Sequence, residues 1–503
     1  MKIKYLFTCV IAASTILIGC KKSWLETEPT QFLTADQLAD AAKLDPKVSA
    51  GTLNGLYVNM YNPGTGGTTN HDDFGQKGYD IYMDMLSSDM VLGATVYGWY
   101  SGIARMTANV DFTTNQTYQP WRYYYRQIYQ ANSIIDGFGG TDYVPTTTNE
   151  KTAIGQAKAM RAYAYFYLSQ LYATEYGNGT AKVLPIYKSS KEESKPKSTI
   201  SEVFDFMISD LTQAITYLTG FSRSTLDQVN INVAKGLLSY VLAARGTTAD
   251  WTQVATYTKD IMNLYPVTDS LSVVYNLLNG KSNPAAGFNN VATPSWIWGV
   301  DVTVASGINL ISWWGQVDYY TYSYAWAGDP KLIDNGLYAL IPTNDRRRSQ
   351  FTTPGALYPG GKFFDPKRTA GGQRTVETDL LYMRADEFYL LNAEANARLG
   401  KEPEAKSALT SLLNQRFKNP TVEVPAYVTP LTGQALLDAI YLQTRIELWG
   451  EGKSYLAMKR NKATIKRGTN HLYDAGNSFA YNDPKLSFVI PQAEVLNNPN
   501  LNK

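Results

Sequence analysis

The sequence predicts a mainly α-helical protein, built of paired helices that are interrupted by a loop-rich insertion. Apolar and aromatic residues recur at three- and four-residue steps through much of the chain, which is the spacing of one helix face. Glycine, proline and asparagine become frequent between about 265 and 378, and a shorter stretch, 63–117, is similarly irregular. With 503 residues the chain is also too long for one compact core.

The first twenty residues are typical of a secretion signal that ends in a lipid attachment site. Two lysines precede an apolar stretch, 5–19, which is too short for a membrane span of about 20 residues. Ile18-Gly19 directly before Cys20 resembles the lipobox of bacterial lipoproteins. We therefore expect residues 1–19 to be removed and Cys20 to carry a lipid that anchors the chain without spanning the membrane. A buried apolar N-terminal helix is the alternative.

Composition excludes several classes of function. A formal net charge of +2 with 18% charged residues gives no electrostatic excess that would attract nucleic acid. Cleavage at Cys20 would also remove Cys9, which leaves no free thiol or disulfide. The chain has only two histidines, His71 and His471, which makes a histidine metal site or a histidine general base improbable. The 37 tyrosines against 17 phenylalanines favour half-exposed recognition surfaces.

The segments of the mature chain follow in order from this pattern. Residues 20–48 are polar and would form a leash between the lipid and the body. The first helical part, 49–264, contains the excursion 63–117, the insertion covers 265–378, and a second helical part covers 379–503. Asn149 is a candidate N-cap for the second of the predicted helices. The helices are expected at about 121–138, 149–176, 201–219, 229–245, 250–264, 379–399, 402–417, 434–449 and 451–463.

Small residues beside large aromatic ones indicate how these helices pack. Ala162 and Ala164, like Ala243 and Ala244, allow close approach of neighbouring helices. Together with the paired breaks, this predicts helical hairpins of the tetratricopeptide type. In the insertion, Trp296 and Trp298 alternate with Ile297, which predicts a short strand with one face directed inward.

Motifs for catalysis fail on spacing or on surroundings. Gly93 and Gly98 have the glycine spacing of a phosphate loop, but Trp99 stands where lysine is required. Asp386 and Glu394 share a helix face, yet eight residues separate their backbones by about 12 Å, too far for a glycosidase pair. No cofactor is expected, and no acidic cluster has the spacing of a calcium loop.

The backbones of Glu447 and Glu451 would be only about 6 Å apart along a helix, so their spacing permits the glycosidase chemistry. The basic neighbours argue for buried ion pairs instead, because they would keep both carboxylates ionised when the reaction needs one neutral acid. These neighbours are Arg445, Lys453, Lys459 and Arg460. We therefore predict a protein that is not an enzyme.

Tryptophan and tyrosine in the irregular stretches are suited to carbohydrate. A sugar ring presents a weakly apolar C–H face, for which an exposed indole or phenol is a platform, and hydroxyls that polar side chains such as Gln316 and Asp318 could bind. For each ring, packing into a local core is the equally weighted alternative. The candidates are Tyr97, Trp99, Tyr100, Trp313, Trp314, Tyr319, Tyr320, Tyr322, Tyr324 and Trp326.

Six blocks between residues 20 and 500 together resemble one family, the SusD-like (RagB/SusD) outer-membrane nutrient-binding lipoproteins, with Asp386-Glu387 as a small departure. The blocks are Cys20 with 24–29, 132–136, 157–173 with Leu184-Pro185-Ile186, 381–398 with Asn414-Gln415-Arg416, 445–452 with 458–460, and 490–494 with 498–500.

The resemblance implies a tetratricopeptide-like body that is lipid-anchored in the outer membrane at the cell surface, caps a SusC-like TonB-dependent transporter and binds glycan through variable loops. It also implies that the residues of the matched blocks hold helices together and are not ligand contacts. These are Arg161, Arg384, Glu394, Arg445 and Glu447. Lys21-Lys22-Ser23 departs from the acidic pair often seen in surface-export signals, which leaves the leaflet open.

Three other functions remain open at this stage. The same architecture could capture peptides, which would favour strand edges and charged pockets over aromatic platforms. A purely structural scaffold would bind no small molecule. A glycosidase would lose turnover on Glu447→Gln. The glycan itself, its linkage and the transporter are not fixed by the sequence.

Overall fold

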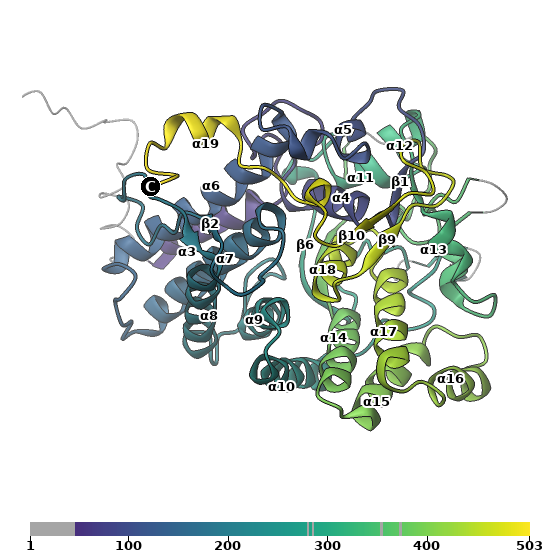
Figure 1. Cartoon of the computed structure of the whole chain (residues 1–503). Helices are drawn as coiled ribbons and strands as arrows, with labels where there is room; N and C mark the ends of the chain where they lie inside the picture. The colour runs from purple at the N-terminus through teal and green to yellow at the C-terminus, as the bar shows by residue number, and fades with distance from the viewer. Residues whose placement is uncertain (1–45, 279–280, 284–285, 353–355, 372–374) are drawn as a thin grey trace, which may run out of the picture.

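The computed structural model describes residues 46–278, 281–283, 286–352, 356–371 and 375–503 (Figure 1). The predicted signal, Cys20 and nearly all of the leash lie outside these residues. Helices dominate, with short strands between them, so the prediction of a mainly α-helical protein is confirmed. Within the described part of the chain, no helix is both long and apolar enough to cross a membrane.

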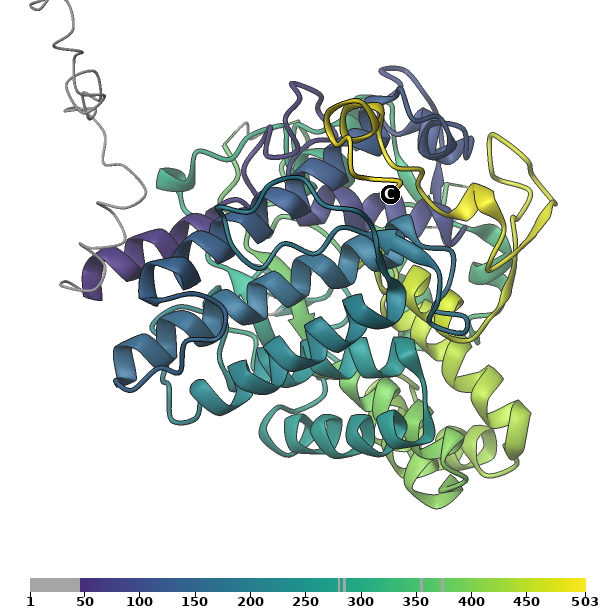
Figure 2. The same ribbon diagram turned by 60° about the vertical axis from the view of Figure 1, so that its left-hand side comes forward.

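The scaffold is a series of antiparallel helices in which sequence neighbours pack together (Figure 2). Helix α7 contacts α6 on one side and α8 on the other, as its wide apolar face predicts. The series continues through α9 and α10 to α14 and its neighbours, so the first and second helical parts join directly. The long helices are α3 (Pro46–Val58), α4 (Gln76–Leu86), α6 (Asn115–Phe138), α7 (Thr148–Tyr172), α8 (Ile200–Tyr217), α9 (Ile231–Arg245), α10 (Thr248–Leu264), α14 (Ala385–Arg398), α15 (Glu402–Leu413), α16 (Pro420–Val428), α17 (Gly433–Glu447) and α18 (Lys453–Arg460).

Capping boxes fix where three of these helices begin. Thr147, Thr199 and Thr247 each accept a hydrogen bond from the backbone three residues on, where an acidic side chain reaches back to the cap. The expected start at Asn149 is therefore wrong by two residues, since Thr147 is the N-cap of α7.

The expected helix 379–399 is wrong in its first turn. Residues Leu380–Arg384 form strand β8, which pairs antiparallel with β6 (Trp296–Val300), and α14 begins only at Ala385. All five residues of β8 are buried, and a short buried apolar run has no period that separates strand from helix. The strand predicted around Trp296 and Trp298 is confirmed, with both faces buried.

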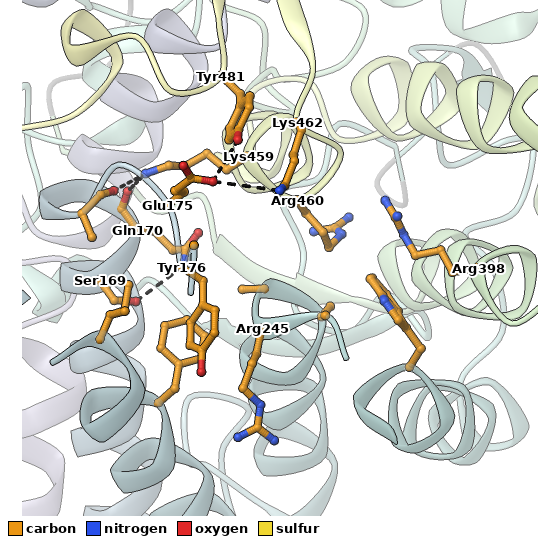
Figure 3. A pocket seen from close by; sticks show the side chains of 18 residues that line it. Ser169, Gln170, Glu175, Tyr176, Arg245, Arg398, Lys459, Arg460, Lys462 and Tyr481 are labelled. Atoms are coloured by element: carbon orange, nitrogen blue, oxygen red, sulfur yellow. Dashed lines mark hydrogen bonds and ion pairs between the residues drawn. The ribbon is translucent and has the colours of Figure 1, made fainter. Parts of the chain in front are cut away.

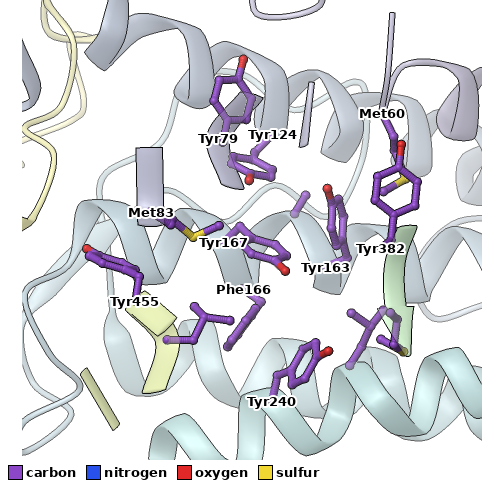
Figure 4. Packing of buried hydrophobic residues seen from close by; sticks show 14 of the residues in the cluster. Met60, Tyr79, Met83, Tyr124, Tyr163, Phe166, Tyr167, Tyr240, Tyr382 and Tyr455 are labelled. Atoms are coloured by element: carbon purple, nitrogen blue, oxygen red, sulfur yellow. The ribbon is translucent and has the colours of Figure 1, made fainter. Parts of the chain in front are cut away.

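Tyrosine is a core residue here more than a surface residue. Tyr79, Tyr124, Tyr163 and Tyr167 pack edge to face or offset between α4, α6 and α7 (Figure 4). Their polar ends are satisfied internally; the hydroxyls of Tyr124 and Tyr163 both donate to the amide oxygen of Gln76. The excess of tyrosine therefore does not by itself indicate a recognition surface.

The insertion contains many short elements. Strand β7 (Lys331–Ile333) pairs antiparallel with β1 (Met90–Leu92), so the insertion is joined to the earlier irregular stretch. Its other short elements are α11 (Trp313–Val317), α12 (Tyr324–Ala327), α13 (Asn335–Ala339), β4 (Leu277–Leu278) and β5 (Lys281–Ser282). The short elements in other parts of the chain are α5 (Ser101–Ala104), α19 (Gln492–Asn497), β2 (Lys182–Leu184), β3 (Ser198–Thr199), β9 (Thr464–Lys466) and β10 (Ser478–Ala480).

Candidate functional site

The two irregular stretches meet where their aromatic residues are most exposed. Beyond the β1–β7 pairing, the carboxylate of Asp329 accepts hydrogen bonds from the backbone N–H groups of Tyr97 and Gly98, both at 3.0 Å. Asp329 directly follows Gly328, the residue that ends α12. Residues 97–98 of the first stretch are thereby fixed against α12 of the insertion.

Four rings form the centre of this contact, and we call them the aromatic cluster: His71, Tyr97, Trp99 and Tyr324. His71 stacks on Trp99 with ring centroids 5.0 Å apart and nearly parallel planes. Tyr324 meets Tyr97 edge to face at 5.1 Å, and its hydroxyl forms a hydrogen bond with Nδ1 of His71. Tyr97 is 57% exposed, Trp99 is half-buried and Tyr324 is buried beneath them.

Trp326 lies on the same short helix as Tyr324, two residues further on, and is a second exposed ring of the insertion. Trp326 is 46% exposed, and its ring centroid lies 6.2 Å from that of Tyr322, which is half-buried. Ser323 caps α12 by accepting a hydrogen bond from the backbone N–H of Trp326. A Cβ at Gly371 would lie 2.9 Å from the indole, so glycine lets the backbone pack beneath this ring. The ring is thus supported by the protein and partly open to solvent.

Tyr319 and Tyr320 are half-buried, and each has a ring neighbour within the protein. Tyr319 stacks on Tyr358 with centroids 4.2 Å apart. The guanidinium of Arg368 lies 4.0 Å from the centre of the Tyr320 ring and 3.9 Å from that of Tyr275. Each ring has a partner on one side, which leaves less of it for a ligand than Trp326 offers.

Tyr100, Trp313 and Trp314 are not exposed platforms, and the sequence prediction is wrong on this point. All three side chains are at most 2% exposed. Trp313 packs against Phe363 and under the ammonium of Lys77, and the Trp314 indole donates to the carbonyl of Asp379. The cause is α11, a five-residue helix whose residues are all buried, so the insertion folds part of its aromatic content into a core.

The polar residues expected to bind hydroxyls are also structural. Gln316 is buried, donates to the backbone carbonyl of His71 and accepts from Lys331. The carboxylate of Asp318 accepts from the backbone N–H groups of Tyr320 and Asp365, and burial raises its pKa to about 6. Gln316 thus holds the backbone of His71, and Asp318 holds residues 318–320 against Asp365.

His71 and Asp329 belong to this site but were not among the predicted site residues. No motif surrounds either of them. Asp329 could have been suspected from its position before Pro330, where a carboxylate commonly caps a turn. His71 could not, because its role depends on a ring nearly thirty residues away.

The glutamates considered for glycoside cleavage are fully engaged in ion pairs. Glu447 contacts Arg347, Arg384 and Arg416, all buried, and Glu451 contacts Arg384 and Lys362. Burial alone would raise the pKa of Glu447, but the three guanidinium charges hold that pKa well below its usual range. Buried ion pairing is therefore confirmed.

The partners proposed for these glutamates were wrong. Three of the proposed basic residues pair elsewhere, because the chain brings other carboxylates to them. Arg445 pairs with Asp89, Lys453 with Glu387 and Arg460 with Glu394, whereas Lys459 donates to backbone carbonyls.

A cavity of about 240 Å³ lies between the α8–α10 hairpins and the C-terminal segment (Figure 3). Its lining is rich in cations, but they are already satisfied. The ammonium of Lys459 donates to the carbonyls of Gln170 and Ala173, and Arg245 makes an ion pair with Asp250. The aromatic cluster is therefore the better candidate for ligand binding.

Comparison with known proteins gives a consistent set of similarities. A family model described as starch-binding and associating with the outer membrane, of the SusD-like type, matches residues 50–241, and a SusD family model matches residues 310–503. The SusD-like protein P38 of Formosa agariphila is 24% identical over 409 residues, which cover 71% of this chain and 75% of that protein.

Solved structures share the fold. A SusD-like carbohydrate binding protein from Bacteroides vulgatus has a TM-score of 0.74 at 24% identity, covering 91% of this chain and 97% of that one. Surface glycan-binding protein A from Bacteroides thetaiotaomicron, solved with laminarihexaose, has a TM-score of 0.64 at 15% identity, covering 90% of this chain and 98% of that one. At these identities the likeness concerns the fold.

Proposed function

Since the chain belongs to the SusD/RagB family, we propose that it binds oligosaccharide or polysaccharide at the aromatic cluster and with Trp326, without cleaving it, and delivers it to a SusC-like TonB-dependent transporter in the outer membrane. The observation that carries the proposal is the meeting of rings from two separate stretches, Tyr97 and Trp99 from one and Tyr324 from the other, with the exposed Trp326 two residues after Tyr324.

The chemistry of this surface favours a sugar. Rings that are supported on one side and open on the other offer flat apolar faces to the C–H face of a pyranose. Hydrogen bonds of Asp329 and Ser323 already fix the backbone, so little ordering is needed when a ligand binds. A bound hexasaccharide in one relative with the same fold supports this class of ligand.

Location and partner rest on sequence and family. The lipobox-like residues before Cys20 support a lipid anchor, and the matching family description supports association with the outer membrane. A transporter encoded beside this chain, co-purifying with it from detergent-solubilised membranes, is the expected partner. A chain that purifies alone under conditions that preserve such complexes would contradict that part of the proposal.

The binding test uses the whole mature protein in affinity electrophoresis and calorimetry against oligosaccharide and oligopeptide panels. Trp99→Ala with Trp326→Ala should weaken glycan binding at least tenfold, which corresponds to about 1.4 kcal/mol. Phe112→Ala is the matched control, because Phe112 is exposed in the same irregular stretch but outside the cluster. Binding of peptides alone would favour peptide capture. Absence of any ligand, with unchanged variants, would favour a structural scaffold.

A further inference from the structure

A groove on the helical side of the molecule is lined by residues of α6, the loop 187–194 and α19. Figure 1 shows where α6 and α19 lie. The volume of the groove, about 600 Å³, is in the range of small-molecule and cofactor sites. We call it the α6 groove. None of the predicted platform residues lines it; its aromatic and basic lining consists of Tyr118, Trp121, Arg122, Tyr125, Arg126, Tyr129 and Tyr187.

The aromatic floor of the α6 groove is held in place before any ligand arrives. Trp121 and Tyr125 have ring centroids 4.8 Å apart, and Tyr187 meets Tyr125 edge to face at 5.9 Å. The Trp121 indole donates to Glu494 of α19, and the Tyr125 hydroxyl donates to the carbonyl of Pro185. Tyr129 continues this row one turn along α6 and is 55% exposed.

The charge that remains available in the α6 groove is positive. Arg122 and Arg126 lie one helical turn apart and are exposed, and neither makes a hydrogen bond or ion pair with another described residue. Of the two carboxylates in the lining, Glu192 is neutralised by Lys195 and accepts from the backbone N–H of Lys188. Glu494 accepts hydrogen bonds from the neutral side chains of Trp121 and Asn498 and keeps its charge, so the two guanidinium groups exceed the uncompensated carboxylates of the lining by one.

One loop connects the α6 groove with the aromatic cluster. Gly67 packs against Arg122, so closely that a Cβ there would lie 2.5 Å from its Cδ, and also against Tyr118. Four residues later, His71 stacks on Trp99. Four residues span at most about 14 Å when fully extended, so the loop residues that touch the two sites lie no farther apart than about three sugar units.

We infer that the α6 groove is a second carbohydrate subsite that selects saccharides bearing carboxylate or sulfate groups. The tyrosine and tryptophan faces stack on sugar rings, and the two unpaired guanidinium groups bind the acidic substituents with paired, charge-assisted hydrogen bonds. The inference rests on the proposed function for its ligand class, and adds the preference for acidic sugars and the residues that produce it.

Calorimetry at physiological salt tests this with three probes: a hexagalacturonate, a sulfated carrageenan hexasaccharide and the neutral laminarihexaose. Arg122→Gln with Arg126→Gln should weaken binding of at least one acidic probe tenfold or more and change binding of the neutral probe less than twofold. Tyr129→Ala should weaken that acidic probe as well. Lys151→Gln with Lys466→Gln removes the same charge from exposed positions outside the groove and should have little effect.

The outcomes separate this inference from the proposed function. Unchanged affinity in the arginine variant, a loss equal to that of the lysine control, or a wild-type protein that binds neither acidic probe would each overturn the acidic subsite. The proposed function fails instead if Trp99→Ala with Trp326→Ala leaves every probe bound as in the wild type. The thermal unfolding midpoint of each variant checks its folding. The arginine and lysine substitutions replace exposed cations, so they should leave this midpoint unchanged.

Discussion

Trp313 and Trp326 are only thirteen positions apart, yet one is a core residue and the other a surface residue. Trp313 contacts Phe363 and Lys77, which approach from distant parts of the chain, whereas Trp326 is covered on one side by Gly371. Nothing in the local sequence distinguishes the two. Exposure is decided by partners far away in sequence, which is why the candidate rings could be chosen from the sequence but not sorted.

Replacing each tryptophan with alanine should therefore affect the stability of the protein very differently. Trp313→Ala removes a buried indole and should lower the free energy of unfolding by about 3–5 kcal/mol. Trp326→Ala should change it by less than about 0.5 kcal/mol. Urea unfolding followed by circular dichroism measures both. Equal effects of the two changes would contradict the burial described here.

Glu447 is expected to be a structural residue with a large contribution to stability. Glu447→Gln leaves the buried charges of Arg347, Arg384 and Arg416 without their shared partner, and loss of one member of such a group costs about 3–5 kcal/mol. Glu404→Gln, on an exposed position of α15, is the control. We expect no glycoside cleavage by either variant or by the wild type, and turnover that depends on Glu447 would refute this.

Two buried lysines should make stability rise with pH above neutrality. Burial lowers the pKa of Lys459 and of Lys331 to about 7, whereas a lysine in the unfolded chain has a pKa near 10.4. Between these values the unfolded chain holds the protons that the folded chain has lost, so the free energy of unfolding increases with pH. Above about pH 10 the sign reverses, because burial raises the pKa of core tyrosines such as Tyr123.

Urea titrations at pH 7, 8 and 9 measure this dependence. Lys459→Met should flatten the rise, and Lys466→Met, at an exposed position, should leave it intact. Equal pH slopes of the wild type and Lys459→Met between pH 7 and 9 would show that this ammonium group is not protonated differently in the two states.

At the scale of elements, the long helices were predictable and the short ones were not. Helices α6 to α10 show several turns of apolar spacing, and the bounds of α8 to α10 lie within two residues of the expected ones. Helix α6 begins at Asn115, six residues before the expected start, and α7 ends at Tyr172, four residues before the expected end. Helices α11 and α12 have five and four residues, too few for any period to appear. Strand β8 is a buried apolar run that continues into α14, so its type depends on pairing with β6. The starts of α7 and α10 are encoded in the sequence by capping boxes, a threonine followed three residues later by an acidic residue, at Thr147 and Thr247.

The start of α4 should be sensitive to a single methyl group. Gly75 has a φ of +74° and a Cβ there would overlap the carbonyl of Met60, so Gly75→Ala adds a steric clash to backbone strain. Gly140 has a φ of +97° with open space around it and isolates the strain alone. We expect the unfolding midpoint to fall further for Gly75→Ala than for Gly140→Ala, and the reverse order would contradict this packing.

At the scale of the whole molecule, the site is built from two stretches that are far apart in the sequence and adjacent in the folded chain. Residues 97–99 and 324–326 meet because β1 pairs with β7, a ladder of three residues across more than two hundred positions. The sequence indicated that both stretches were irregular and aromatic. Their contact through Asp329 and His71 needed the folded chain, because no periodic pattern encodes it.

The lipid anchor can be tested in cells with the full chain. Cys20→Ser should move the protein from the membrane fraction to the soluble fraction and retain the folded body, because residue 20 lies well before the first described helix. Fractionation with immunodetection measures this, and metabolic labelling with a fatty acid provides the control. Continued membrane association of an unlabelled variant would show that another segment holds the protein there.

The Asp329 carboxylate has a consequence for redesign of ligand preference. It accepts hydrogen bonds from two successive amides of the opposing loop, so part of what holds that loop is independent of its side chains. Libraries that vary the side chains at 97 and 99 should therefore keep residue 329, which retains this main-chain attachment when the ring contacts change. A graft of the insertion loop from another protein has to bring a carboxylate to the same place.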